Sequence, residues 1–96
     1  MEQVIGSRSL RQRSSECVAR ASQGETFIVC YYGRPAVALG PRSGEDPREE
    51  VSATTLWRDM PRALGWARRS PVLITWRGQP VAVLGPVPEE WRTVQR

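Results

Sequence analysis

The sequence predicts an α+β fold in which two tandem β-α-β-β units share one antiparallel sheet, with helices packed on it. The first observation is an internal repeat: residues 27–41 match residues 72–86 without a gap, and both end in Gly-x-Pro, three Ala or Val residues, and Leu-Gly-Pro. The second is that the segments before these repeats carry apolar residues at identical helical spacing. The third is size, because a unit of roughly 40 residues rarely folds alone, so the two copies must share a core.

Helices are predicted before each repeated hairpin. Offsets of 0, 4, 7, 8 and 11 place one set of small or apolar residues on one helical face in each copy. The two sets are Leu10, Ser14, Cys17, Val18 and Ala21, and Leu56, Met60, Ala63, Leu64 and Ala67. The first helix is expected to begin at Ser7 or Arg8 and to end at Gln23-Gly24, and the second to have Thr54 as its N-cap. Pro61 lies inside the second helix and predicts a kink or a restart there.

Strands are predicted on both sides of each helix. A short β segment is expected around Val4-Ile5 and around Val51, and β-branched and aromatic residues favour strands at 27–31 and 72–76. A glycine then marks a turn, and a second apolar strand follows Pro35 or Pro80. The predicted layout is a single domain over 1–96, with repeat one at 4–41, a polar linker at 42–50, repeat two at 51–86 and a short tail at 87–96.

The charge of the chain favours a polyanionic partner. The 96 residues carry a net charge of +4, and all fourteen basic residues are arginine, with no lysine or histidine. Arginine suits phosphate and guanine recognition, although exclusive use of arginine also matches a GC-rich genome. No apolar run approaches the roughly 20 residues needed to span a bilayer, and no signal peptide is recognisable. We therefore expect a cytoplasmic protein without a membrane partner.

Enzyme, metal and cofactor chemistry find no support in the sequence. Cys17 and Cys30 are not paired in a metal-binding motif, and both are expected to be small core residues. There is no histidine, no nucleophile beside a base, and no Gly-rich phosphate loop. The expectation is a non-enzyme without metal or cofactor.

The first copy resembles the amino-terminal DNA-binding domain of the Phd/YefM antitoxin family. The resemblance is carried by Leu-Arg-Gln-x-Ser-Ser-Glu-x-Val from Leu10, Gly-Glu-x-Phe-Ile-Val from Gly24, and Gly-Arg-Pro-x-Val-Ala-Leu from Gly33. It covers residues 4–41 well and 51–86 more loosely. Members of that family are dimers whose two copies form one sheet, so the resemblance implies a pseudo-dimer within a single chain.

The resemblance implies a DNA-binding regulator that represses its own operon, and an antitoxin of a bacterial type II toxin-antitoxin pair. Its partners would be double-stranded DNA and a toxin protein. Arg11 matches the helix arginine of the family, and Arg8 shares its face at i, i+3 spacing. Arg13 points elsewhere and is expected to meet phosphate or solvent.

The second copy departs from the family pattern. Trp57 occupies the position of the helix arginine, so the two halves are not expected to contact equal half-sites. We expect an asymmetric operator contacted mainly by the first copy, with Arg58, Arg62 and Arg77 supplying weaker phosphate contacts. The alternative for each of these arginines is a solvated surface residue, and for Arg20 an ion pair with Glu16.

A protein-interaction module is the alternative function. Trp57, Trp66 and Trp91 are candidates for a partner-binding surface, or for packing where the two halves meet. The segment 87–96 is expected to bury too little surface to neutralise a toxin in the usual way, which favours a regulator. Further self-association through free sheet edges stays open.

Overall fold

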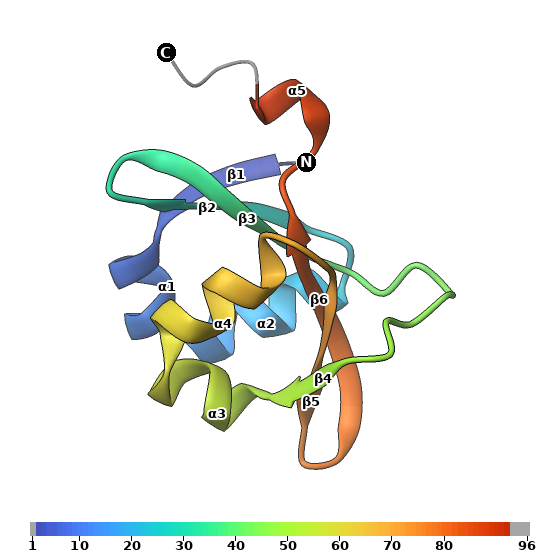
Figure 1. The fold of residues 1–96 in the computed structure, drawn as a ribbon. Helices are drawn as coiled ribbons and strands as arrows, with labels where there is room; N and C mark the ends of the chain where they lie inside the picture. The colour runs from blue at the N-terminus through green and yellow to red at the C-terminus, as the bar shows by residue number, and fades with distance from the viewer. Residues whose placement is uncertain (1, 93–96) are drawn as a thin grey trace.

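One six-stranded sheet organises the chain, and Figure 1 shows the sheet curving around helices of both halves. The protein is described by a computed structural model that covers residues 2–92, so residues 93–96 of the predicted tail lie outside the described residues. The first half contains β1 (Glu2–Gly6), α1 (Ser7–Gln12), α2 (Ser14–Ser22), β2 (Thr26–Tyr31) and β3 (Arg34–Gly40). The second half contains β4 (Glu50–Ser52), α3 (Ala53–Arg58), α4 (Met60–Ala67), β5 (Val72–Trp76) and β6 (Gln79–Pro86), and α5 (Glu89–Arg92) follows.

The sheet is mixed, so the expectation of a purely antiparallel sheet is wrong. The strand order is β1-β2-β3-β6-β5-β4, and the outer pairs β1-β2 and β4-β5 are parallel. The three inner pairs are antiparallel. Each outer pair is joined through helices that return the chain to the same end of the sheet, and this crossover makes the two strands parallel.

The two hairpins have the same geometry. Val29 and Ile74 each precede a register shift in the ladder, which marks a bulge. The loop between Tyr31 and Arg34 has two residues, and Tyr32 and Gly33 both have positive φ, of 53° and 78°. The corresponding residues of the second hairpin, Arg77 and Gly78, have φ of 53° and 79°. Two positive φ angles in a two-residue loop match the turn type that suits the twist of a hairpin.

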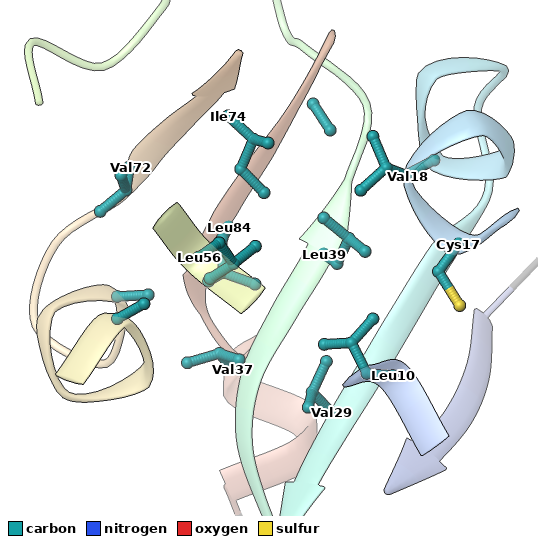
Figure 2. Close-up of a cluster of buried hydrophobic side chains, with 14 of the residues drawn as sticks. Leu10, Cys17, Val18, Val29, Val37, Leu39, Leu56, Val72, Ile74 and Leu84 are labelled. Carbon is teal, nitrogen blue, oxygen red and sulfur yellow. The ribbon is translucent and has the colours of Figure 1, made fainter. Parts of the chain in front are cut away.

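The two halves meet where β3 pairs with β6. Leu39 and Leu84 lie opposite each other in this pairing, and both are fully buried. Helices α2 and α4 pack on these two central strands, whereas α1 and α3 pack on the outer strands of their own halves. Figure 2 shows side chains from both halves pointing into one apolar cluster. Leu10 and Leu56 enter that cluster from α1 and α3, and neither is exposed.

Each predicted helix is broken in two. The breaks fall at Arg13 and Asp59, whose backbone angles leave the helical region. The restart expected near Pro61 is confirmed, since α4 begins at Met60 with the proline in its first turn. The prediction of Thr54 as N-cap is wrong: Ser52 holds that position, and its Oγ accepts a hydrogen bond from the Thr55 N–H at 3.1 Å. The predicted strands and the apolar face are confirmed, and Leu10, Cys17, Val18 and Ala21 are all buried.

Among residues 2–92, no helix is long and apolar enough to cross a membrane.

Candidate nucleic-acid interface

Helix α1 presents two arginines to solvent. It begins directly after β1, and the fully buried Leu10 fixes its rotation against the core. Arg8 and Arg11 are therefore on the outer side of α1, and both are exposed. Within the described part of the chain, neither guanidinium forms an ion pair or a side-chain hydrogen bond. Among residues 2–92, they have no internal partner that an external anion would first have to displace.

Arg13 differs from these two because a carboxylate already holds it. Its Nη2 lies 2.7 Å from Oε2 of Glu16, and about half of each side chain is exposed. The hydrogen bond from Arg13 lowers the pKa of Glu16, and the same contact raises the pKa of Arg13. A phosphate that binds Arg13 would have to displace the Glu16 carboxylate or share the guanidinium with it.

Arg20 belongs to a polar network that supports the fold. Its Nε and Nη2 donate to the two carboxylate oxygens of Glu25 at 2.7 and 2.6 Å, and its guanidinium stacks over Phe27. Gln3 on β1 also donates to Glu25, at 2.8 Å. The expected pair with Glu16 is present at 3.5 Å, but it is the longer contact. This network joins β1, α2 and the start of β2.

The arginines proposed from the second half are exposed but dispersed. Arg58 is the last residue of α3, Arg62 lies on α4, and Arg77 lies at the tip of the β5-β6 hairpin. The guanidinium carbon of Arg62 lies 5.0 Å from the ring centre of Trp66, and that of Arg77 lies 5.6 Å from Trp76. These stacking contacts leave the guanidinium edges open to phosphate.

The three tryptophans considered for partner binding have different surroundings. Trp57 is partly buried and packs against the core cluster. Trp91 donates its indole N–H to Oε1 of Glu2 at 2.9 Å, which ties α5 to β1. Trp66 is 49% exposed. Trp66 is therefore the best placed of the three to meet a partner.

Two hollows lie between a hairpin of one half and a helix of the other. The first, of about 300 Å³, lies between α2 and the β5-β6 hairpin, with Trp57 and Trp76 in its wall. The second, of about 590 Å³, lies between α4 and the β2-β3 hairpin, and it includes Arg34 and Arg68. Neither arginine is among the site residues predicted from the sequence. Arg34 stands in the repeated Gly-x-Pro motif, but its closeness to α4 depends on long-range packing.

Among residues 2–92, no charged or polar residue is buried, and no cluster of three metal-ligating side chains occurs. Cys17 is buried and Cys30 is half-buried, and burial raises the pKa of both thiols. The surface features of the described residues are thus arginines, aromatic rings and hollows.

Comparison with known proteins finds similarity to an antitoxin. Over 50 residues the chain is 40% identical to antitoxin VapB46 of Mycobacterium tuberculosis, in strains CDC 1551 / Oshkosh and ATCC 25618 / H37Rv. The alignment covers 52% of this chain and 49% of each relative, so the chain spans about half the length of the curated relatives it matches. No family model matches the chain, and no solved structure matches it.

Proposed function

We propose that this protein is an antitoxin-type transcriptional regulator that binds double-stranded DNA through α1. The observation that carries the proposal is the pair of exposed arginines Arg8 and Arg11, which form no ion pair with any described residue, in a chain that is 40% identical to an antitoxin over 50 residues. Planar guanidinium groups can bind phosphate or the O6 and N7 atoms of guanine in a bidentate manner. Repression of its own operon and a toxin partner belong to the same proposal.

The chain is further proposed to be a pseudo-dimer of Phd/YefM type that arose by duplication, in one domain over 1–96. Constant spacing supports this: Phe27 pairs with Leu39, and Val72 pairs with Leu84, both shifted by 45 residues. The bulges and the positive φ angles of the two hairpins obey the same shift. Leu39 pairs with its own counterpart, Leu84, as a two-fold axis through the sheet centre would require. The proposal keeps the expected division into repeats at 4–41 and 51–86, a linker at 42–50 and a tail at 87–96.

The operator is proposed to be asymmetric. In the aligned helices, Arg11 corresponds to Trp57 and Arg8 corresponds to Thr54. A partly buried tryptophan and a threonine cannot replace two free guanidinium groups on DNA. The first half would then supply base contacts, and Arg58, Arg62 and Arg77 would supply phosphate contacts. Arg13 would contribute only by giving up part of its pairing with Glu16.

Arg11→Ala tests the proposal directly. Binding to duplex DNA from upstream of the gene should weaken by about 1–3 kcal/mol, because a free guanidinium that contacts DNA is lost. Fluorescence anisotropy between about 50 and about 200 mM salt should also give a smaller salt slope for the variant. Arg42→Ala removes the same charge from a residue already paired with Asp46 at 2.6 Å, and it serves as the control.

Two results would refute DNA binding through α1. One is a wild-type affinity that does not change with salt, since phosphate contacts release counterions. The other is equal weakening by Arg11→Ala and Arg42→Ala, which would indicate a general effect of net charge.

A protein-interaction role is the second candidate, favoured by the 49% exposure of Trp66. Tryptophan and arginine are both enriched among the residues that contribute most to protein interfaces, and Arg62 stacks on Trp66. Under this alternative, Trp66→Ala would abolish capture of a partner while Arg11→Ala would have no effect. Pull-down with both variants, alongside the DNA titration, separates the two functions.

A further inference from the structure

A positively charged groove crosses the boundary between the two halves. Its main part is the hollow of about 590 Å³, within the roughly 300–1,000 Å³ typical of ligand sites. That hollow is lined by Tyr31, Tyr32, Arg34, Pro35, Ala36, Pro61, Leu64, Gly65 and Arg68. A second hollow of about 390 Å³ is lined by Gly65, Arg68 and Arg69. Since the two share Gly65 and Arg68, together they form one cationic groove along α4.

Within residues 2–92, no ion pair neutralises the arginines of the cationic groove, although Arg69 also lines a separate hollow that includes Glu49 and Glu50. Arg34, Arg68 and Arg69 are exposed, and none of their side chains pairs with a carboxylate of the described residues. No acidic residue lines either hollow. By contrast, acidic partners hold Arg13, Arg20 and Arg42 elsewhere on the surface. The groove therefore offers three guanidinium groups to a ligand.

The floor of the groove is apolar. Ala36, Pro61 and Leu64 line the same hollow as Arg34 and Arg68, and Gly65 leaves the helix surface open because it has no side chain. The rings of Tyr31 and Tyr32 meet edge to face at 4.5 Å, so they form a wall more than a flat stacking surface. A suitable ligand carries negative charge and apolar groups within a short length.

The other hollow between the two halves has no charged lining. It lies between α2 and the β5-β6 hairpin and is lined by Ser15, Val18, Ala19, Ser22, Ala53, Trp57, Trp76 and Val81. No charged residue lines it, and its volume is about 300 Å³. The alignment of the two halves places Ala19 where the cationic groove has Gly65. The chain thus contains a matched hollow of different chemistry.

We propose that the cationic groove binds an extended acidic segment of a partner protein. Carboxylates of the segment bind Arg34 at one end and Arg68 and Arg69 at the other, and an apolar side chain covers Pro61 and Leu64 between them. Charge complementarity selects this occupant, because duplex DNA supplies phosphates but no apolar group to cover the floor. The groove uses none of the arginines proposed above for DNA.

Gly65→Leu tests the groove without disturbing the core. A Cβ built on Gly65 meets nothing within 4 Å, and replacing a helical glycine favours the helix. The leucine side chain would fill the floor of the groove. Ala19→Leu is the control, since it adds comparable bulk to the uncharged hollow.

The probe is the end-blocked peptide Asp-Glu-Leu-Phe-Glu-Asp. The full chain is titrated with this peptide, and binding is measured from the NMR shifts of the backbone amides. We expect shifts at Gly65, Arg68 and the β2-β3 turn, and an affinity that falls with salt. Gly65→Leu should weaken binding at least about tenfold, and Arg34→Gln should weaken it too, while Ala19→Leu should not.

Three outcomes would overturn the proposal. The first is equal binding of the peptide with Lys in place of every acidic residue, and the second is unchanged binding to Gly65→Leu. The third is tighter binding of single-stranded hexathymidylate at the same amides, which would make the groove a nucleic-acid site. Duplex binding by Gly65→Leu, measured in parallel, is expected to remain normal, so this test is independent of the DNA proposal.

Discussion

Individual arginines differ in what already binds them, and this difference decides which can serve a ligand. Arg20 uses two nitrogens to hold Glu25, and Arg13 is held by Glu16. Arg8 and Arg11 have no such contact among the described residues. The sequence predicted the positions on α1 from spacing and resemblance. It could not predict which guanidinium groups would be paired, because Glu25 reaches Arg20 only after the chain turns into β2.

The Arg20 contact gives a prediction in acid. The hydrogen bond from Arg20 lowers the pKa of Glu25 in the folded protein. The contact therefore stabilises the fold in full at pH values above the ordinary glutamate pKa of about 4.3. The effect is lost as the pH falls through the lowered pKa. In Arg20→Gln, the Glu25 pKa should rise toward its ordinary value, and carboxyl NMR titration measures it. Arg42→Gln should leave Glu25 unchanged and raise the pKa of Asp46 instead.

At the scale of elements, local patterns predicted the strands and the buried helix faces. The apolar spacing continues across the breaks at Arg13 and Asp59. Helices α1 and α2 together still bury one apolar face, and so do α3 and α4. The break at Arg13 has no proline or glycine to signal it. The break was not predicted because it results from packing on different strands. Helix α1 packs on β1 and β2, whereas α2 packs mainly on β3 and β6.

Helix capping gives a prediction for the start of α3. Ser52 Oγ accepts from the Thr55 N–H and lies 2.9 Å from the Thr55 Oγ1. Ser52→Ala should lower the free energy of unfolding by about 1 kcal/mol, because the first turn loses its side-chain cap. Urea unfolding followed by circular dichroism measures this loss. Thr54→Ala, at the position wrongly expected to be the cap, should have a much smaller effect, and equal effects would contradict the assignment.

For the whole molecule, long-range pairing explains what the sequence did and did not predict. The repeat predicted a common sheet because neither half is large enough to fold alone. The parallel outer pairs were missed because spacing within a strand does not specify its neighbour. The cationic groove was missed for a related reason: α4 and the β2-β3 hairpin come from different halves, and they meet only through the β3-β6 pairing.

That pairing predicts that the halves unfold together. Three of the four tryptophans, Trp57, Trp66 and Trp76, lie in the second half, so tryptophan fluorescence reports mainly there, while circular dichroism reports on all helices and strands. Leu10→Ala removes a fully buried side chain from the first half and should cost about 2–5 kcal/mol. Because both halves share one core, its fluorescence and circular dichroism transitions in urea should stay coincident and shift equally. Leu56→Ala, the counterpart in α3, should behave in the same way. A fluorescence midpoint that stays at the wild-type value in Leu10→Ala would mean that the second half folds without the first.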